Sequence, residues 1–559
     1  MQRQKTALIS VYDKNGIEDF AKSLRSLGWK IISSGGTAKH LSDAGIPVTD
    51  VAEITGMKEI LSHRVVTLHP KILGGILALN TPEHLAELKK LGIPWIDLVC
   101  CDLYPLEAEI VKHTPSAFGT SPYIGGGREG VLEKTDIGGP TMIRSGAKGG
   151  RITICDSADR GKVIEWLKNS EPNRAQFLSD LAAKAEAMIS RYCDLSANYH
   201  SRGSYRSIFG KKILECAYGE NAYQKPANLF EVSKAGFDME DKLTIKNWQL
   251  IAGSPLSYNN ICDLDRMMQT MTHIGAGFEK NFSAVPKVAI GAKHGNACGV
   301  GVSEIAKVRL WQGQSPTLAK LDAIDKMLLG DLRAIFGGSV MLNFPVDEKI
   351  AEELIHKYCE PNRRLLDVIS APSFSPEAVE ILSRKKGKCR LLANKNIEKA
   401  GLSSLDTAER FRYVRGGFLE QPNYTFVPKL DPLLISPLAG GEGSNTILQD
   451  IILAWAIGST SNSNTITIVK NGRLFGNGVG QQDRVGAAKL AILRADDAAR
   501  FAYKNLGAEL PCGSSAPKCA DLENATAYSD SFFPFPDAVE ALINRGIKTI
   551  FSTSGSVND

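Results

Sequence analysis

Two adjacent residues, Lys293 and His294, place a positive charge beside a proton carrier at the end of an apolar run that begins at Val288. Such a β-branched run is typical of a buried strand, and open α/β sheets hold their ligands in a crevice at strand ends. An imidazole with a pKa of about 6.5 can accept a proton, and an adjacent ammonium group lowers that pKa further. The pair therefore predicts a proton-transfer site in a crevice. The simpler interpretation, two solvated side chains at a strand end, fits most isolated Lys-His pairs.

A second group of residues, in the first third of the chain, has the types that bind a phosphate. Ser34-Gly35-Gly36-Thr37 lies between a predicted strand and a predicted helix, where glycines allow a tight turn and free N–H groups point at an anion. Lys14 can add a charge, and Arg64 and Thr67 add donors from another segment. A Ser-Gly-Gly-Thr turn alone is more often only a turn. Tyr104, Asp136 and Lys148 could transfer protons beside a bound phosphosugar.

A regular α/β framework must position these residues, and the apolar pattern predicts one. Short apolar runs alternate with amphipathic stretches, which is typical of a parallel sheet with helices on both faces. We expect strands over 7–11, 30–33, 97–101 and 151–154, and helices over 16–27, from about 37 to 41, and over 173–199. Residues 115–133 and 434–443 have the composition of loops. The remainder repeats the α/β theme and is long enough for two subdomains.

Bulk composition narrows the class of protein. With 559 residues the chain is too long for one core, so we expect two to four domains. A net charge of +5 is weak; it does not indicate nucleic-acid binding, but it suits small anionic substrates. The 11 cysteines show no disulfide framework or zinc spacing, which predicts reduced thiols in a cytoplasmic protein. No segment has the apolar length of a signal region or a membrane span, so no membrane association is expected.

The motifs of the first part resemble the cyclohydrolase half of the family of bifunctional purine biosynthesis proteins (PurH). They occupy residues 9–14, 34–39, 67–70, 102–105 and 136–141. The resemblance implies a methylglyoxal-synthase-like fold that closes the ring of FAICAR to give IMP and water. It implies that the nucleotide phosphate is held by Ser10, Lys14, Ser34, Gly36, Thr37, Arg64 and Thr67. Tyr104, Asp136 and Lys148 would flank the closing ring, where a weak nucleophile attacks a formyl carbon.

The second part resembles the AICAR formyltransferase half of the same family. Its motifs lie in order at 218–221, 256–260, 293–294, 336–338, 371–374, 415–419, 463–464, 480–484 and 529–535. The resemblance implies two cytidine-deaminase-like α/β subdomains without a catalytic metal, which pass a formyl group from 10-formyltetrahydrofolate to the AICAR amine. His294 would be the general base, Lys293 would position it and stabilise charge, and Asn464 would hold the formyl group or oxyanion. The AICAR pocket would include Tyr218, Asn260, Gly337, Asp367, Arg484 and Phe533.

The same resemblance implies an organisation for the whole chain. We expect a cyclohydrolase domain over 1–205 and a formyltransferase domain over 206–559, with a subdomain boundary near 375–430. The family forms homodimers, so a homodimer is expected. Two assignments have simpler alternatives, because Asn464 has the type of a turn residue and Phe533 that of a core aromatic.

Several positions depart from the family pattern. Val66 replaces a lysine, Ala217 replaces an arginine that contacts the AICAR phosphate, and Gly149-Gly150 replaces Asn-His. Lys71 or Lys148 could compensate for Val66, and Arg415 or Arg484 for Ala217. The family pattern also continues past the position of Asp559 into an Arg-containing final strand, which the sequence does not include. These departures keep a second hypothesis open: a non-catalytic nucleotide- or folate-binding paralogue. A third, a methylglyoxal-synthase-like lyase with an appended domain, leaves Lys293-His294 and Asn464 unexplained.

Overall fold

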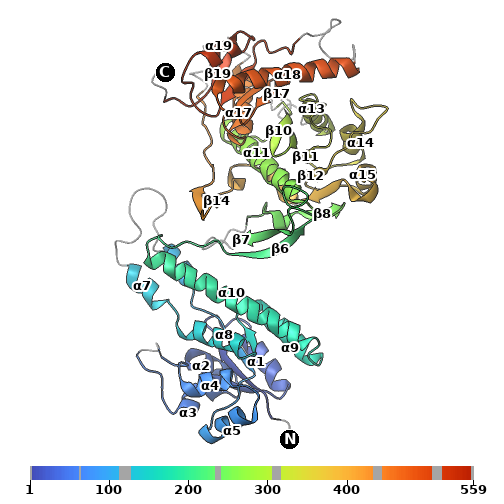
Figure 1. Cartoon of the computed structure of the whole chain (residues 1–559). Helices are drawn as coiled ribbons and strands as arrows, with labels where there is room; N and C mark the ends of the chain where they lie inside the picture. Colours follow the sequence, from blue (N-terminus) through green and yellow to red (C-terminus); the bar gives the residue numbers. More distant parts are fainter. Residues whose placement is uncertain are drawn as a thin grey trace. The chain divides into compact units, whose positions relative to one another are not determined.

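The structure is a computed structural model that describes residues 3–61, 65–112, 127–232, 241–304, 316–431, 444–506 and 519–555. It divides into two compact units, each with its own main sheet (Figure 1). The first unit comprises residues 1–210 with 232–238, and the second comprises 211–231 with 239–559.

The first unit is built on a five-stranded sheet with the order β3-β2-β1-β4-β5. Every neighbouring pair in it is parallel. The strands are β1 (Thr6–Ser10), β2 (Lys30–Ser33), β3 (Thr49–Asp50), β4 (Leu98–Cys101) and β5 (Ile152–Ile154). Because parallel strands share one direction, all their carboxyl ends lie at one edge of the sheet, and that edge is where a ligand is expected.

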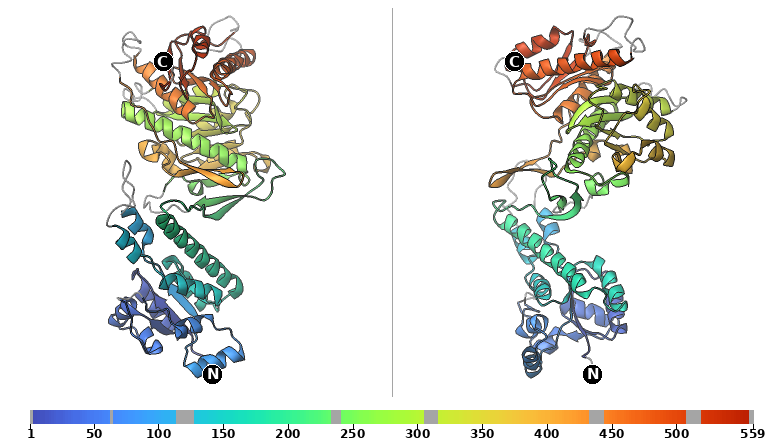
Figure 2. Two further views of the ribbon diagram at one scale, coloured as in Figure 1. Left: turned by 60° about the vertical axis from the view of Figure 1, so that its left-hand side comes forward. Right: turned by 45° about the vertical axis from the view of Figure 1, so that its right-hand side comes forward.

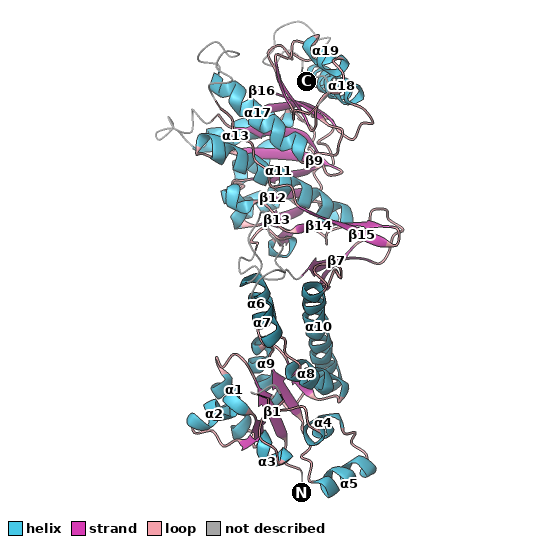
Figure 3. Ribbon diagram, turned by 90° about the vertical axis from the view of Figure 1, so that its left-hand side faces the viewer, coloured by secondary structure: helices cyan, strands magenta, loops and turns pink. Residues whose placement is uncertain are grey.

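Helices cover both faces of this sheet. Along β1, Ala7 and Ile9 pack into one hydrophobic cluster and Leu8 into another, as the alternation of a strand requires. The first cluster contains residues of α1 (Ile17–Ser26) and α9 (Arg160–Lys168); the second contains residues of α4 (Pro70–Leu77) and α8 (Gly138–Lys148). Figure 3 shows β1 between α1 and α2 on one side and α4 and α8 on the other. The predicted parallel sheet with helices on both faces is confirmed.

Element boundaries differ from the predicted ones by one or two residues, with one larger difference. The remaining helices are α2 (Gly35–Asp43), α3 (Val51–Thr55), α5 (Pro82–Leu91), α6 (Leu106–Lys112), α7 (Gly127–Glu133) and α10 (Arg174–His200). The prediction of a loop over 115–133 is wrong for 127–133, because these residues form α7. Residues 115–126 lie outside the described part of the chain, as does the segment 434–443.

The second unit contains a ten-stranded mixed sheet with the order β19-β18-β16-β17-β10-β9-β11-β12-β13-β8. Its strands are β8 (Gln249–Ala252), β9 (Val288–Lys293), β10 (Asn296–Val302), β11 (Ser339–Leu342), β12 (Val368–Ala371), β13 (Arg390–Ala393), β16 (Ile466–Lys470), β17 (Arg473–Gly478), β18 (Thr526–Ser529) and β19 (Thr549–Phe551). Pairing of β10 with β17 at Gly301 and Arg473 joins its two halves. The α/β class predicted for this region is therefore confirmed.

Helices bury both faces of this second sheet. Val288 and Ile290 of β9 face a cluster that includes residues of α11 (Tyr258–Phe282) and α17 (Ser444–Ser459), whereas Ala289 faces a cluster under the helices on the other side. Those helices are α13 (Pro316–Leu328), α14 (Glu348–His356) and α15 (Pro376–Leu382), and α18 (Arg484–Leu506) and α19 (Asp537–Ile543) cover the β16–β18 end. In Figure 2 the long light-green helix is α11.

Two hairpins complete the second unit. They are β6 (Gly210–Cys216) with β7 (Ala227–Val232), and β14 (Glu409–Val414) with β15 (Gly417–Pro422). The second hairpin falls within the range 375–430, where we predicted a subdomain boundary. None of the helices in the described segments combines the length and apolar character needed to cross a bilayer.

Candidate active sites

The carboxyl ends of β1 and β2 bring predicted phosphate-binding residues together. Ser10 ends β1, and Ser34 follows β2 at the N-cap of α2. The two strands pair in parallel up to Ile9 and Ser33, so the two hydroxyl groups lie at the same edge. The side chain of Ser34 makes no capping hydrogen bond within the described structure, and a Cβ added at Gly36 would meet nothing within 4 Å. The N-terminus of α2 therefore offers an uncapped hydroxyl to an anion, with the Glu59 carboxylate nearby at 3.6 Å from a Cβ added at Gly35.

Thr37 and Lys14 lie at the same edge but are already engaged. The Thr37 hydroxyl donates to the Val11 carbonyl at 3.0 Å and accepts the Val11 N–H at 3.2 Å. The Lys14 ammonium donates to the carbonyl oxygens of Val11 and Tyr12. Burial lowers the pKa of Lys14, although nearby Asp102 opposes this shift. An anion at this edge would meet a positive charge that is partly buried.

Thr67 and Asp136 meet at the N-terminus of α8. A Cβ added at Gly138 would lie 3.3 Å from Thr67 Oγ1 and 3.9 Å from Asp136 Oδ1. Asp136 Oδ1 accepts the Gly139 N–H at 3.0 Å. Burial raises the pKa of the Asp136 carboxyl, while the N–H groups of Gly139, Gly138 and Tyr104 lower it. This carboxyl is therefore held beside Tyr104 and retains its proton to higher pH than a solvated Asp.

Tyr104 belongs to a small aromatic cluster with Tyr12 and Lys134. The two rings meet edge to face with centroids 5.4 Å apart. Lys134 Nζ lies 5.4 Å from the Tyr12 centroid and 5.6 Å from the Tyr104 centroid. Neither Tyr12 nor Lys134 was among the predicted site residues. Tyr12 lies inside the motif at 9–14 and Lys134 two positions before Asp136, which were the available signals.

The structure does not bring Lys148 to Tyr104 and Asp136. Asp136 precedes the first turn of α8, and Lys148 is its last residue, exposed to solvent. At about 1.5 Å per residue, the length of this helix separates them by roughly 15 Å. Lys148 lies near the edge where β5 begins, opposite the phosphate-binding edge. Arg64 lies outside the described residues.

In the second unit, Lys293 and His294 lie at the carboxyl end of β9, in the tight hairpin that joins β9 to β10. β9 and β10 pair with Lys293 opposite Asn296, and His294 and Gly295 form the two-residue turn with φ of 52° and 69°. Both values are positive, as a type I′ turn requires. β9 runs antiparallel to β11, with Ala292 opposite Ser339. The pair thus lies at a strand end, as predicted, and because β9 runs antiparallel to β11, that end lies beside the first residues of the parallel strands β11 and β12.

A half-buried carboxylate on α11, that of Asp263, holds this turn. Asp263 Oδ1 accepts the Gly295 N–H at 2.7 Å, and Oδ2 accepts the Ser339 hydroxyl at 3.0 Å. Burial raises the pKa of Asp263, whereas these two donors and the charge of His294 lower it. Sequence reasoning missed Asp263, although it lies only three positions after the predicted Asn260.

Lys293, Gly337 and Asp367 gather beside the turn. Lys293 Nζ donates to the Phe336 carbonyl at 3.1 Å, and a Cβ added at Gly337 would lie 3.9 Å from that Nζ. Gly337 has φ of 74°, which favours glycine. The Asp367 N–H donates to the Gly338 carbonyl at 2.9 Å. Lys293 and Gly337, from two separate motifs, and Asp367 are thus neighbours.

Asn260 and Tyr218 lie at the start of α11, which carries Asp263 one turn later. Asn260 Oδ1 accepts from the Ser257 N–H at 3.0 Å and the Ser257 hydroxyl at 2.9 Å, so the side chain completes a capping box. The Tyr258 N–H donates to the Tyr218 carbonyl at 3.2 Å. Asn260 therefore has a structural role, whatever else it contacts.

Asn464, Arg484 and Phe533 gather at the β16–β18 end of the sheet. Asn464 Nδ2 donates to the Gln481 carbonyl at 3.0 Å. Arg484 forms an ion pair with Asp530, whose Oδ1 also accepts the Thr465 N–H at 2.9 Å. Phe533 is partly buried against the hydrophobic cluster under α18.

Two polar links connect this group to the His294 turn. Asn477 Nδ2 donates to the Ala297 carbonyl at 3.3 Å and to the Ser461 hydroxyl at 3.2 Å. Arg266, whose Cβ lies 3.9 Å from a Cβ added at Gly295, donates to the Thr460 carbonyl at 2.7 Å. These contacts tie the segment just before Asn464 to the hairpin that carries His294.

Comparisons with known proteins show the family to which the chain belongs. A family described as the AICARFT/IMPCHase bienzyme matches residues 151–494, and a family described as the MGS-like domain matches residues 16–116. The bifunctional purine biosynthesis protein PurH of Brucella ovis is 34% identical over 100% of this chain and 93% of its own. PurH of Oceanobacillus iheyensis is 32% identical over 99% of this chain and 95% of its own. The chain belongs to the PurH family.

Among solved structures, the crystal structure of ForH is 32% identical over 36% of this chain and 100% of its own, with a TM-score of 0.31. A likeness of that size carries no argument about the PurH fold.

Two departures from the PurH pattern have a place in the structure. Val66 is half-buried directly before Thr67, so it lies next to the predicted phosphate site. Ala217 is exposed, and its N–H donates to the Leu256 carbonyl at 3.2 Å. Of the two arginines expected to compensate for it, Arg484 is paired with Asp530, and Arg415 is exposed in the turn between β14 and β15.

The described residues contain no group of three or more His, Cys, Asp or Glu side chains that could hold a metal ion.

Proposed function

We propose that this chain catalyses both reactions of the PurH family. The second unit would transfer a formyl group from 10-formyltetrahydrofolate to AICAR, and the first unit would close the ring of FAICAR to give IMP. The observation that carries the proposal is the His294 turn, which places an imidazole, the Lys293 ammonium and the half-buried Asp263 carboxylate in one neighbourhood. The full-length similarity to PurH proteins supports the pairing of the two activities in one chain.

For formyl transfer, His294 would remove a proton from the AICAR amine. The nitrogen then attacks the formyl carbon, the bond from that carbon to N10 of the folate breaks, and N10 takes a proton to give tetrahydrofolate. Lys293 and Asn464 would stabilise the negative charge that develops on the formyl oxygen. Tyr218, Asn260, Gly337, Asp367, Arg484 and Phe533 would line the AICAR pocket.

Asp263 would act as a positioning residue for His294. By accepting the Gly295 N–H it holds the backbone of the turn, and its negative charge would stabilise the imidazolium formed after proton transfer. Burial raises the pKa of Asp263, whereas the hydrogen bonds from the Gly295 N–H and the Ser339 hydroxyl lower it. These two hydrogen bonds therefore favour the charged carboxylate.

For ring closure, the uncapped Ser34 hydroxyl at the N-terminus of α2 supports phosphate binding by Ser10, Lys14, Ser34, Gly36, Thr37, Arg64 and Thr67. Asp136 and Tyr104 would move protons while the carboxamide nitrogen of FAICAR attacks the formyl carbon and the formyl oxygen leaves as water. We propose Lys134, rather than Lys148, as the cation beside Tyr104, because it lies 5.6 Å from that ring. The 1–205 and 206–559 domain division remains part of this proposal.

We also propose that the chain is a cytoplasmic homodimer that uses 10-formyltetrahydrofolate as a cosubstrate and needs no catalytic metal. The family resemblance supports this assembly. Sedimentation velocity at several protein concentrations tests the dimer, and activity in the presence of a chelator tests the metal independence.

One experiment tests the main proposal against its rival. Purified full-length protein is given AICAR and 10-formyltetrahydrofolate, and tetrahydrofolate and IMP are measured separately. Formation of both supports two activities. Tetrahydrofolate without IMP would locate a defect in ring closure, next to Val66. Neither product would favour the nucleotide- or folate-binding paralogue, for which Val66 and Ala217 are the motivating observations.

A further inference from the structure

A second polar region of the first unit lies at the sheet edge opposite the phosphate-binding residues. A cavity of about 220 Å³ is lined by Arg3, Asn80, Leu85, Trp95, Asp97, Gly150, Arg151 and Arg174. Arg3 lies just before β1, Asp97 directly before β4 and Arg151 directly before β5. The cavity is therefore at the amino ends of these strands, separated from Ser10 and Ser34 by the length of the sheet.

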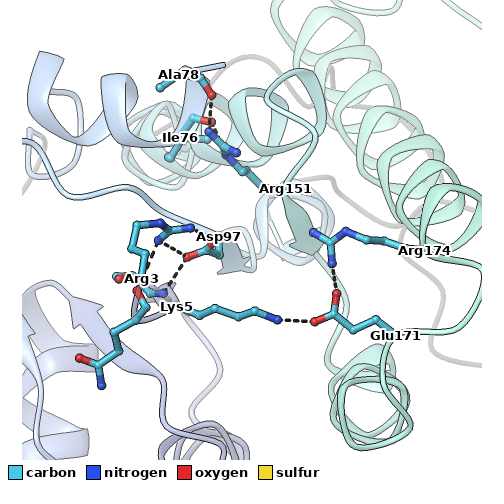
Figure 4. Close-up of polar contacts among 10 residues, drawn as sticks. Arg3, Lys5, Ile76, Ala78, Asp97, Arg151, Glu171 and Arg174 are labelled. Carbon is cyan, nitrogen blue, oxygen red and sulfur yellow. Dashed lines mark hydrogen bonds and ion pairs between the residues drawn. The ribbon is translucent and has the colours of Figure 1, made fainter. Parts of the chain in front are cut away.

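Positive charge exceeds negative charge around this cavity. Arg3 pairs with Asp97, while Lys5 and Arg174 both pair with Glu171 (Figure 4). Arg151 has no carboxylate at ion-pair distance among the described residues. Four positive side chains thus share two carboxylates, which leaves a net charge of +2 on the cluster.

Arg151 is the buried member of the cluster. The residue is 7% exposed, and its Nε and Nη2 donate to the carbonyls of Ile76 and Ala78 at the end of α4. Its guanidinium also lies 4.0 Å from the Trp95 ring centroid. Burial lowers its pKa to about 10. The remaining nitrogen, Nη1, has no acceptor in the part of the chain that the structure describes, so a positive charge is held beside the cavity with both N–H donors of Nη1 unused.

The first turn of α10 adds to this field. Arg174 is the first residue of that 27-residue helix, and its first turn contains no acidic residue. The positive end of the helix dipole is therefore not compensated within the helix itself. The cavity is smaller than the several hundred Å³ typical of drug-sized ligands, which limits its ligand to a few heavy atoms.

We propose that this cavity is a second anion site, one that binds a phosphate group and is separate from both substrate sites. Arg3 and Arg174 would contribute donors from the rim, and Arg151 would contribute Nη1 from the wall. Planar guanidinium groups match phosphate oxygens well, and a phosphate dianion would balance the net charge of the cluster. The shared chemistry is the phosphate group, carried either by inorganic phosphate or by a small sugar phosphate.

The test is a calorimetric titration of the full-length protein with inorganic phosphate and, separately, with ribose 5-phosphate. AICAR and IMP are kept saturating so that the substrate sites are filled, and potassium chloride at equal ionic strength is the reference. Arg3→Gln and Arg174→Gln are the informative variants because their side chains are 47% and 49% exposed, so neither is expected to disturb folding. Arg144→Gln, on a 71% exposed side chain paired with Glu186, is the matched control.

We expect saturable binding near one equivalent per chain, weakened about tenfold or more by either informative variant and unchanged by the control. Tighter binding of ribose 5-phosphate than of inorganic phosphate, with the same sensitivity, would identify a phosphorylated metabolite as the ligand; the reverse order would identify free phosphate. The proposal would be overturned if the phosphate titration released no more heat than the potassium chloride reference. It would also be overturned if the parent and all the variants bound phosphate with equal affinity. Retained ring closure from supplied FAICAR shows that each variant is folded.

Discussion

The carboxylate of Asp263 accepts the backbone N–H of Gly295 at 2.7 Å, and this contact ties α11 to the turn that carries His294. The second carboxylate oxygen accepts the Ser339 hydroxyl at 3.0 Å, at the start of β11. One half-buried side chain thereby joins a helix, a hairpin and a parallel strand. The position of the candidate general base depends on all three.

Asp263→Asn is expected to lower kcat for formyl transfer by up to about 100-fold, since loss of the charge and a small shift of the turn both disfavour proton transfer. The amide can still accept the Gly295 N–H, so the variant should fold. Ser339→Ala, which removes only the second donor, serves as the milder companion. Initial rates of tetrahydrofolate formation across pH give the readout. An Asp263→Asn enzyme with an unchanged pH profile would exclude the positioning role.

His294→Ala should abolish measurable formyl transfer, because a general base contributes about 10²- to 10⁴-fold to rate. Ring closure from supplied FAICAR should stay intact, since that site lies in the other unit. His356→Ala changes a histidine on α14 that lies outside the candidate site and should affect neither reaction. Loss of both activities in His294→Ala would point to misfolding instead of a missing base.

Lys134→Ala should slow ring closure more than Lys148→Ala does. Lys134 Nζ lies 5.6 Å from the Tyr104 ring, whereas Lys148 lies at the far end of α8 from Asp136. Steady-state ring closure with FAICAR compares the two, and formyl transfer by the same preparations checks their integrity. A larger loss in Lys148→Ala would contradict the assignment.

Val66→Lys should raise kcat/KM for ring closure, because it supplies a donor and a charge directly before Thr67. Val66→Met is the matched control, as methionine adds length without charge. If the lysine variant closes the ring no faster than the parent, then Val66 does not limit this reaction.

The environment of Asp450 predicts that the free energy of unfolding depends on pH. Its carboxylate accepts the N–H groups of Asn471 at 2.8 Å and Gly472 at 2.7 Å, and burial raises its pKa to about 6. Because the folded state holds this proton more tightly than the unfolded state, the contribution of Asp450 to stability is full below pH 4 and is lost as the pH rises through about 6. The difference corresponds to at most about 3 kcal/mol.

Asp450→Asn should therefore cost more stability at pH 4.5 than at pH 7, relative to the parent. Thermal unfolding of both proteins at the two pH values measures this difference. A penalty that is the same at both pH values would show that Asp450 does not titrate between them.

Local sequence determined the parts of this protein that depend on neighbouring residues. The apolar run before Lys293, the strands at 30–33 and 151–154, and the Ser34-Gly35-Gly36-Thr37 turn are each set by side-chain pattern and glycine placement within a few residues. The ordered motifs at 9–14 and 293–294 likewise indicated the family.

Only the tertiary structure decided which motifs meet. Strand direction is a long-range property, so the sequence did not show that β9 runs antiparallel to β11 and brings His294 to the first residues of parallel strands. Asp263 and Gly295 are 32 positions apart and share no local pattern. The rise of α8 separates Lys148 from Asp136, although both belong to one stretch of sequence. Burial, which depends on packing from distant elements, sets the charge state of Asp136, Asp263 and Asp450.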